Sequence, residues 1–294
     1  GSSQQAVHFA AMAIMSGTQD VVVAGGVQTM SKIPIGASMI AGRELGFDHP
    51  FHTSPGWLKR FGDAPVDQFY GASEIAKRWG FSRKDLEEFS LNSHRRADKA
   101  RDSGWFNKEI SSINGLEQDE TIRANTSMER MAELEAFDAH GLITAGVASQ
   151  TCDGSSAILL ASADAVKRYN LKPRARIHHL EVMGDDPILM LTGPIAATKR
   201  ALFRAGMNSS EIDLAECNEA FASVPMAWMQ ETNIPHEKTN VNGGAISLGH
   251  PLGSTGTKLM TTLLHEMERR GVRYGLQTMC DGGGVANVTI LDRR

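Results

Sequence analysis

The sequence has little cysteine, no strong excess of either charge and no long apolar run, and each absence excludes a class of protein. Its 3 Cys among 294 residues are too scattered for a disulfide framework and lack the CxxC spacing of a zinc site. The net charge of −4 is spread along the chain, which argues against a nucleic-acid partner. No apolar stretch reaches the roughly 20 residues that span a bilayer. We therefore expect reduced thiols, no metal site, no membrane partner and a cytoplasmic location.

Strands and helices alternate through the second half of the chain, which is typical of a layered α/β fold. Aliphatic runs at residues 21–24 and 157–161 predict buried strands. Four further strands are expected at residues 175–180, 214–217, 275–279 and 287–291. Apolar spacing and capping residues predict helices at residues 4–16, 73–79, 83–103, 194–205, 219–230 and 255–270, with Ser82 as the N-cap of the third.

Differences in polarity and regularity divide the sequence into three regions. Residues 31–142 are more polar and irregular and predict an inserted loop domain. Residues 1–30 with 143–170 predict one apolar layered domain, and residues 171–294 predict a second. A turn, a helix, a strand and a glycine pair or triplet occur in the same order in residues 1–30 and 249–284. This order indicates that one structural unit is present twice.

The chain begins directly with an apolar helix. Residues 4–16 are almost wholly apolar apart from two Gln and His8. A helix of this composition is normally buried, and a buried helix seldom starts a polypeptide at its first residue. We therefore expect that a segment precedes Gly1 in the natural protein, which leaves any targeting sequence unassessed.

The densest chemical signal is NVNGGAISLGHPLGSTG, residues 240–256. Its glycines permit close backbone approach to a ligand, and the helix that follows favours negative charge at its N-terminus. A phosphate-binding loop is the rival interpretation, but neither GxGxxG nor GxxxxGK[ST] occurs here. His250, held between Gly249 and Pro251, is the candidate base, with a purely structural histidine as the alternative.

Two further segments carry candidate groups. In MCDGGG, Cys280 leaves a strand directly into three glycines, whose N–H groups could stabilise an oxyanion. A small buried thiol is the alternative for this residue. In CNEAFAS, Asn218 lies at a junction between a strand and a helix, where it could be either a site residue or an N-cap.

The segments NEAFA, GGAISLGHPLGSTG and MCDGGG, in this order and at these separations, resemble the three C-terminal signatures of the thiolases. These enzymes are the acetyl-CoA acyltransferases and acetyltransferases. VVVAGGVQTMS, DETIRANTSMERMAEL and LITAGVASQTCDGSSA extend the resemblance through the chain. The resemblance implies a thiolase-like α/β fold of duplicated layered halves with an inserted loop domain.

The resemblance also implies a set of catalytic roles. The acyl-accepting Cys would stand directly before Gly1, so the 294 residues alone are expected to be inactive. His250 would activate that thiol, and Cys280 would move the proton at the α-carbon of acetyl-CoA. Asn218 would hold a water, and the N–H of Gly282 would serve an oxyanion.

Substrate contacts are implied in the same way. Ser149 matches a position that faces the pantetheine chain of coenzyme A, and Arg123 matches one near its nucleotide end. Coenzyme A is then a substrate, and no cofactor is expected. The resemblance also implies a homodimer or a homotetramer. Short-chain biosynthetic members often carry His-Met-Gly where this chain has Phe69-Tyr70-Gly71, so degradative cleavage of a longer 3-ketoacyl-CoA stays open.

Two other functions remain open from the sequence. A fatty-acid or polyketide condensing enzyme of the same superfamily would use two His and typically lacks the C-terminal catalytic Cys, so Cys280 argues against it. A non-catalytic subunit that binds coenzyme A or a protein partner is the other alternative.

Overall fold

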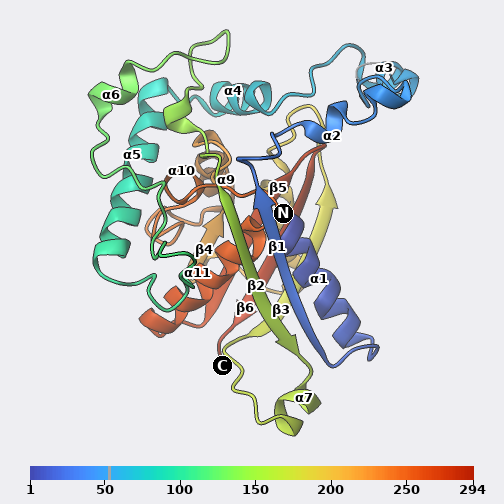
Figure 1. Cartoon of the computed structure of the whole chain (residues 1–294), viewed down its shortest axis with the longest axis vertical. Helices are drawn as coiled ribbons and strands as arrows, with labels where there is room; N and C mark the ends of the chain where they lie inside the picture. The colour runs from blue at the N-terminus through green and yellow to red at the C-terminus, as the bar shows by residue number, and fades with distance from the viewer. Residues whose placement is uncertain (52–53) are drawn as a thin grey trace.

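The computed structural model describes residues 1–51 and 54–294 (Figure 1). Two sheets organise the chain. The first is an antiparallel pair, and the second has four strands in the order β3-β6-β5-β4, of which β4 and β5 are parallel. The strands are β1 (Val21–Thr29), β2 (Asp153–Ala161), β3 (Arg176–Gly184), β4 (Leu214–Cys217), β5 (Tyr274–Asp281) and β6 (Val285–Asp292).

Two helices lie between the sheets. α1 (Ser2–Met15) and α11 (Thr255–Arg270) contact each other and both sheets (Figure 1). α8 (Gly193–Ala205) covers the opposite face of the four-stranded sheet and contacts α9 (Ser223–Thr232). The order of layers is therefore sheet, helices, sheet, helices. This arrangement confirms the predicted α/β layering.

The remaining helices belong mainly to the segment between β1 and β2. They are α2 (Ala37–Ile40), α3 (Pro55–Phe61), α4 (Gln68–Trp79), α5 (Arg83–Asp102), α6 (Met128–Ala132), α7 (Ala163–Arg168) after β2, α10 (Ala245–Leu248), and 3-10 turns at Arg43–Leu45, Ala145–Val147 and Ser209–Glu211. Ser82 caps α5 as predicted, since its hydroxyl accepts from the Asp85 N–H while the Asp85 carboxylate accepts from the Ser82 N–H. No helix among the described residues is both long and apolar enough to cross a bilayer.

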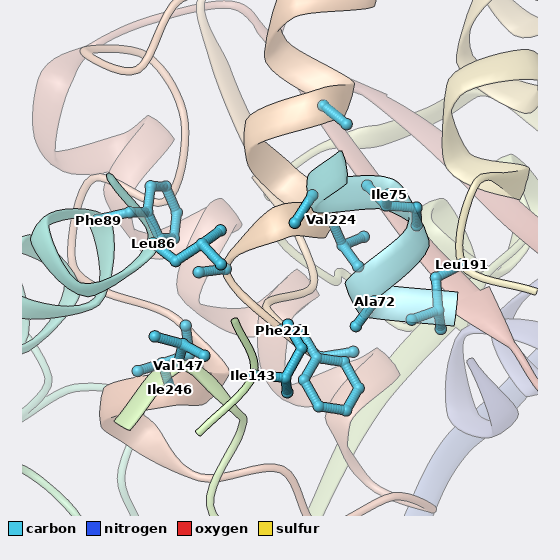
Figure 2. Close-up of a cluster of buried hydrophobic side chains, with 14 of the residues drawn as sticks. Ala72, Ile75, Leu86, Phe89, Ile143, Val147, Leu191, Phe221, Val224 and Ile246 are labelled. Carbon is cyan, nitrogen blue, oxygen red and sulfur yellow. The ribbon is translucent and has the colours of Figure 1, made fainter. Parts of the chain in front are cut away.

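An apolar cluster joins the segment between β1 and β2, here called the loop region, to the C-terminal half of the chain. Figure 2 shows Ala72 and Ile75 of α4 and Leu86 of α5 packed with Phe221 and Val224 at the start of α9. Because these residues come from distant parts of the chain, their burial fixes the loop region against the segment that follows β4.

Three sequence predictions were wrong. The strands at residues 21–24 and 157–161 are not fully buried: Val23 is 68% exposed and Leu159 is 55% exposed. Only one face of the pair packs on α1 and α11, and no described layer covers the other. The helix predicted at residues 219–230 begins only at Ser223, because residues 219–222 form a buried bend and turn.

The third error concerns α1, which is buried on one face only, where Val7, Ala10 and Ala11 lie together with polar side chains. Phe9 and Met15 are exposed, whereas Gln4 and His8 are fully buried. The Gln4 side chain donates to the Thr289 hydroxyl at 3.0 Å, and His8 Nε2 lies 2.8 Å from the same oxygen. Polar pairing to β6 therefore acts on the same face as the apolar contacts of Val7 and Ala10, while part of the apolar surface of the helix stays exposed.

The packing of α1 on α11 predicts a sharp stability effect at Gly256. A β-carbon at this position would overlap the backbone nitrogen of Gln4, so Gly256→Ala must move one helix. We expect the free energy of unfolding in urea to fall by about 1–3 kcal/mol. Gly56→Ala is the matched control, because its β-carbon meets only the Ser54 hydroxyl at 3.8 Å; it should be neutral or stabilising by up to about 1 kcal/mol. Equal stability of the two variants would contradict the packing.

Candidate active site

The site lies where β4 and β5 end and α1 begins. Cys217, the last residue of β4, pairs with Thr278 of β5, and the Asn218 N–H donates to the Thr278 carbonyl at 3.1 Å. Cys280 follows two residues later on β5. Gly1, at the N-terminus of α1, lies beside the Asp281 carboxylate. The carboxyl ends of two parallel strands and one helix N-terminus therefore meet at one place.

His250 reaches this place from the segment between α10 and α11. Its backbone N–H donates to the Gln150 carbonyl at 2.8 Å, and its ring Nε2 lies 3.5 Å from Asn218 Nδ2. Burial lowers the pKa of His250 to about 3, and the positive charge of Lys258 acts in the same direction. The imidazole is therefore neutral at physiological pH and would need a neighbouring anion, such as a thiolate, to hold a proton.

Asn218 offers an unused acceptor to the site. The residue is 1% exposed, and its Oδ1 has no hydrogen-bond partner among the described residues. An unpaired buried carbonyl costs roughly 1–3 kcal/mol, so a donor such as water or substrate would be stabilising here. Asn218 is not the N-cap of α9, which begins five residues later. The water-holding role implied by the resemblance fits this geometry and stays a prediction.

Cys280 is half-buried and packs against the apolar cluster of α4 and α5. Burial raises the pKa of its thiol to about 12, and the charge of Asp281 acts in the same direction. A thiol in this state keeps its proton at neutral pH. It therefore suits donation of a proton to a carbanion better than it suits nucleophilic attack.

Gly282 lies at an open position beside these groups. A β-carbon there would have no neighbour within 4 Å, so an incoming group could approach its backbone. The residue lines a cavity together with Gly1, Ser2, Gln5, Asp281, Val285 and Asn287. Whether its N–H serves an oxyanion stays a prediction.

Glu219 is the residue that sequence reasoning missed. Its buried carboxylate accepts hydrogen bonds from the Ser93 hydroxyl at 2.8 Å, from Asn240 Nδ2 at 3.0 Å and from the Ile246 N–H at 3.1 Å. Burial raises the pKa of this carboxyl, and these bonds act against the rise. A β-carbon on Gly244 would overlap the same carboxylate. This glycine therefore makes room for a protein carboxylate, whereas the sequence suggested an approaching ligand.

Ser149 and Arg123 both neighbour Gln150, the first in the sequence and the second through a side-chain hydrogen bond. The Ser149 N–H donates to the Ala220 carbonyl at 3.0 Å, which places it beside the NEAFA segment. Arg123 is exposed, and its Nε donates to Gln150 Oε1 at 3.0 Å. Since the Gln150 carbonyl also accepts the His250 N–H, one residue links both predicted substrate contacts to the candidate base.

A second cavity lies apart from these residues. It is lined by α11 and the segment after α5, and it includes Trp105, Glu109, Asn242 and His265. Burial raises the pKa of Glu109 to about 7. None of the predicted site residues lines this cavity. Among the described residues, no group of His, Cys, Asp and Glu has the arrangement of a metal site.

Comparison with known families decides what the site belongs to. Residues 1–164 match the family described as "Thiolase, N-terminal domain", and residues 171–293 match "Thiolase, C-terminal domain". The chain belongs to the thiolase family. It is an acyl-CoA C-acyltransferase, as the signatures predicted.

Similar proteins agree with this assignment. The steroid 3-ketoacyl-CoA thiolase FadA6 of Mycobacterium tuberculosis is 53% identical over 297 residues, which cover 100% of this chain and 73% of the relative. The 3-ketoacyl-CoA thiolase of Idiomarina loihiensis is 39% identical, with 100% and 76% covered. The crystal structure of human mitochondrial 3-ketoacyl-CoA thiolase superposes with a TM-score of 0.88 at 34% identity, covering 100% of this chain and 76% of that chain. The similarity confirms the predicted thiolase-like fold.

The neutral state of His250 predicts a pH effect on stability. Its folded pKa of about 3 lies below the usual 6.5, so between these values the unfolded thiolase binds a proton that the folded one excludes. Stability due to this residue is therefore full above pH 6.5 and is lost as the pH falls toward 3. Urea unfolding at pH 7 and pH 5 should show a smaller loss for His250→Asn than for the unmodified chain. Identical losses would contradict the low pKa.

Proposed function

We propose that this thiolase works in the degradative direction and cleaves 3-ketoacyl-CoA with free coenzyme A. The observation that carries the proposal is the meeting of His250, Asn218 and the protonated thiol of Cys280 at the N-terminus of α1. The names of the relatives support the direction, since those at 53% and 39% identity are called 3-ketoacyl-CoA thiolases.

The first half of the reaction breaks the bond between the α- and β-carbons. The nucleophilic Cys expected directly before Gly1 gives its proton to His250 Nε2 and attacks the 3-keto carbon. The bond to the α-carbon then breaks, and its electron pair forms the enolate of acetyl-CoA. The Cys280 thiol donates its proton to that carbon, and acetyl-CoA leaves. A water held by Asn218 Oδ1 would stabilise the enolate oxygen together with His250.

The second half transfers the acyl group to free coenzyme A. The coenzyme A thiol loses its proton to the Cys280 thiolate and attacks the acyl-enzyme carbonyl. The Gly282 N–H would stabilise the oxyanion in this step. The enzyme cysteine then leaves, takes back the proton that His250 held, and acyl-CoA is released. Protons and electrons therefore balance over one turnover without a metal or redox cofactor.

Coenzyme A would lie along the side of the site that Gln150 organises. Ser149 would contact the pantetheine chain, and Arg123, exposed and held through its Nε, would meet the phosphates of the nucleotide end. A solved human relative was crystallised with CoA, which supports a coenzyme A substrate. We further propose a cytoplasmic homodimer or homotetramer, in line with the composition and the family resemblance.

The acyl group would be larger than acetyl. Phe69 packs edge to face on Phe221 and Phe137, with ring centroids 5.3 and 5.4 Å apart. The same apolar cluster contacts Cys280, so it lies next to the reacting carbon. An aromatic wall favours a bulky apolar acyl group, and the relative at 53% identity is named for steroid substrates.

The catalytic roles predict strong losses of thiolysis. In the natural gene product that contains this chain, His250→Ala and Cys280→Ala should each lower kcat at least ~10²-fold, as acid–base groups do. The measurement is the loss of the 3-ketoacyl-CoA absorbance on addition of free coenzyme A. His140→Ala, at an exposed histidine, is the control and should leave the rate unchanged.

Two outcomes would contradict these roles. Near-normal turnover in either variant would remove that residue from the mechanism. A gene product with no Cys before Gly1 that binds coenzyme A without turnover would instead favour the non-catalytic subunit.

The aromatic wall predicts a substrate preference. The natural enzyme should show a higher kcat/KM for a ring-bearing 3-ketoacyl-CoA than for acetoacetyl-CoA. The double variant Phe69→His with Tyr70→Met restores the residues of short-chain members, and we expect it to shift this ratio at least ~10-fold toward acetoacetyl-CoA. An unchanged ratio would place the acyl group elsewhere.

A further inference from the structure

The two nitrogens of His250 meet different kinds of partner. Nδ1 lies 2.7 Å from the Thr255 hydroxyl oxygen, whereas Nε2 faces the Asn218 amide at 3.5 Å. The same Thr255 hydroxyl lies 3.0 Å from the Pro251 carbonyl oxygen. These contacts link the Pro251 carbonyl, the Thr255 hydroxyl and the His250 imidazole in one row at the N-terminus of α11.

The position of each proton follows from the donors that these groups possess. A carbonyl oxygen only accepts, so the contact with Pro251 is a hydrogen bond when the single hydroxyl proton of Thr255 points to it. With that proton on the Pro251 side, the hydroxyl oxygen accepts from His250, and the short contact then holds a proton on Nδ1. A neutral imidazole with a proton on Nδ1 has none on Nε2.

The partner on the opposite side of the ring is consistent with this assignment. Asn218 turns its Nδ2 toward the imidazole, and an amide nitrogen is a donor only. A contact with Nε2, although long, is favourable only when Nε2 carries a lone pair. Both sides of the ring therefore favour the same tautomer.

We propose that Thr255 is a positioning residue that holds His250 in the tautomer protonated at Nδ1, so that Nε2 faces the site unprotonated. Nε2 is then the nitrogen that receives the proton of the enzyme thiol. A hydroxyl is a neutral acceptor, so it orients the ring without stabilising the imidazolium as a carboxylate would. The low pKa of His250 agrees with this, and the proton it receives is readily returned. Only the catalytic consequence rests on the proposed function; the tautomer does not.

The tautomer is measured directly by nitrogen NMR of the chain labelled with ¹⁵N-histidine at pH 7, with the His250 signal assigned from its loss in His250→Asn. We expect a protonated Nδ1 and an unprotonated Nε2. A protonated Nε2 in the unmodified chain overturns the proposal.

Two substitutions test the role of the hydroxyl. Thr255→Val keeps the shape but removes the acceptor, and loss of one neutral hydrogen bond should shift the ratio of tautomers roughly 2- to 12-fold. Thr255→Ser keeps the hydroxyl and should keep the spectrum of the unmodified chain. An unchanged ratio in a folded Thr255→Val chain overturns the proposal.

Kinetics in the natural gene product separate this inference from the proposed function. We expect Thr255→Val to lower kcat by a similar factor with KM for coenzyme A unchanged, and Thr255→Ser to restore it. If the tautomer shifts in Thr255→Val but kcat does not change, the tautomer assignment stands and the role of His250 as base fails. If KM rises and kcat does not change, Thr255 serves binding, and its positioning role in catalysis is overturned.

Discussion

The buried carboxylate of Glu219 is the interaction on which the site depends. It follows Asn218 directly after β4 and accepts hydrogen bonds from Ser93 of α5 and from the Ile246 N–H of α10, the helix that precedes His250. The Glu219 side chain thus joins α5, the end of β4 and the helix that precedes His250. A carboxylate can be buried in this way only because several donors surround it. Its presence explains why a glycine stands at position 244, where any β-carbon would overlap it.

The layered fold brings the chemistry to one end of the molecule for a simple topological reason. β4 and β5 are parallel, so their carboxyl ends lie at the same edge of the sheet. Asn218 follows β4 there, and Cys280 is the last residue but one of β5. The helices between the sheets begin at that edge, so the N-terminus of α1 and the segment before α11 lie there too (Figure 1). Burial in this corner keeps His250 neutral and keeps the Cys280 thiol protonated. The two groups are therefore prepared for opposite tasks, one to accept a proton and the other to donate one.

Much of this was predictable from the sequence, because local signals and tertiary packing agree in the C-terminal half. The bounds of α11 and β4 match the predicted ranges, and Ser82 caps α5 as expected. The failures occur where a distant partner decides. The apolar pattern of residues 4–16 does not reveal Thr289, which pairs with Gln4 and His8 and so buries two polar side chains of α1. From the sequence, Glu219 was expected in the first turn of a helix. Only the structure shows that three donors from remote segments bind its carboxylate and hold these segments together. The domain boundaries remain predictions.

The central claim is that thioester chemistry takes place between His250, Asn218 and Cys280 at the N-terminus of α1. A crystal structure of the natural gene product with a bound, unreactive 3-ketoacyl-CoA analogue tests it most directly. The account predicts the thioester oxygen within hydrogen-bond distance of His250 Nε2 or of a water on Asn218 Oδ1, with the α-carbon next to the Cys280 thiol. An analogue seated with its reacting carbons in the cavity lined by Trp105 and Glu109, away from these three residues, would contradict it.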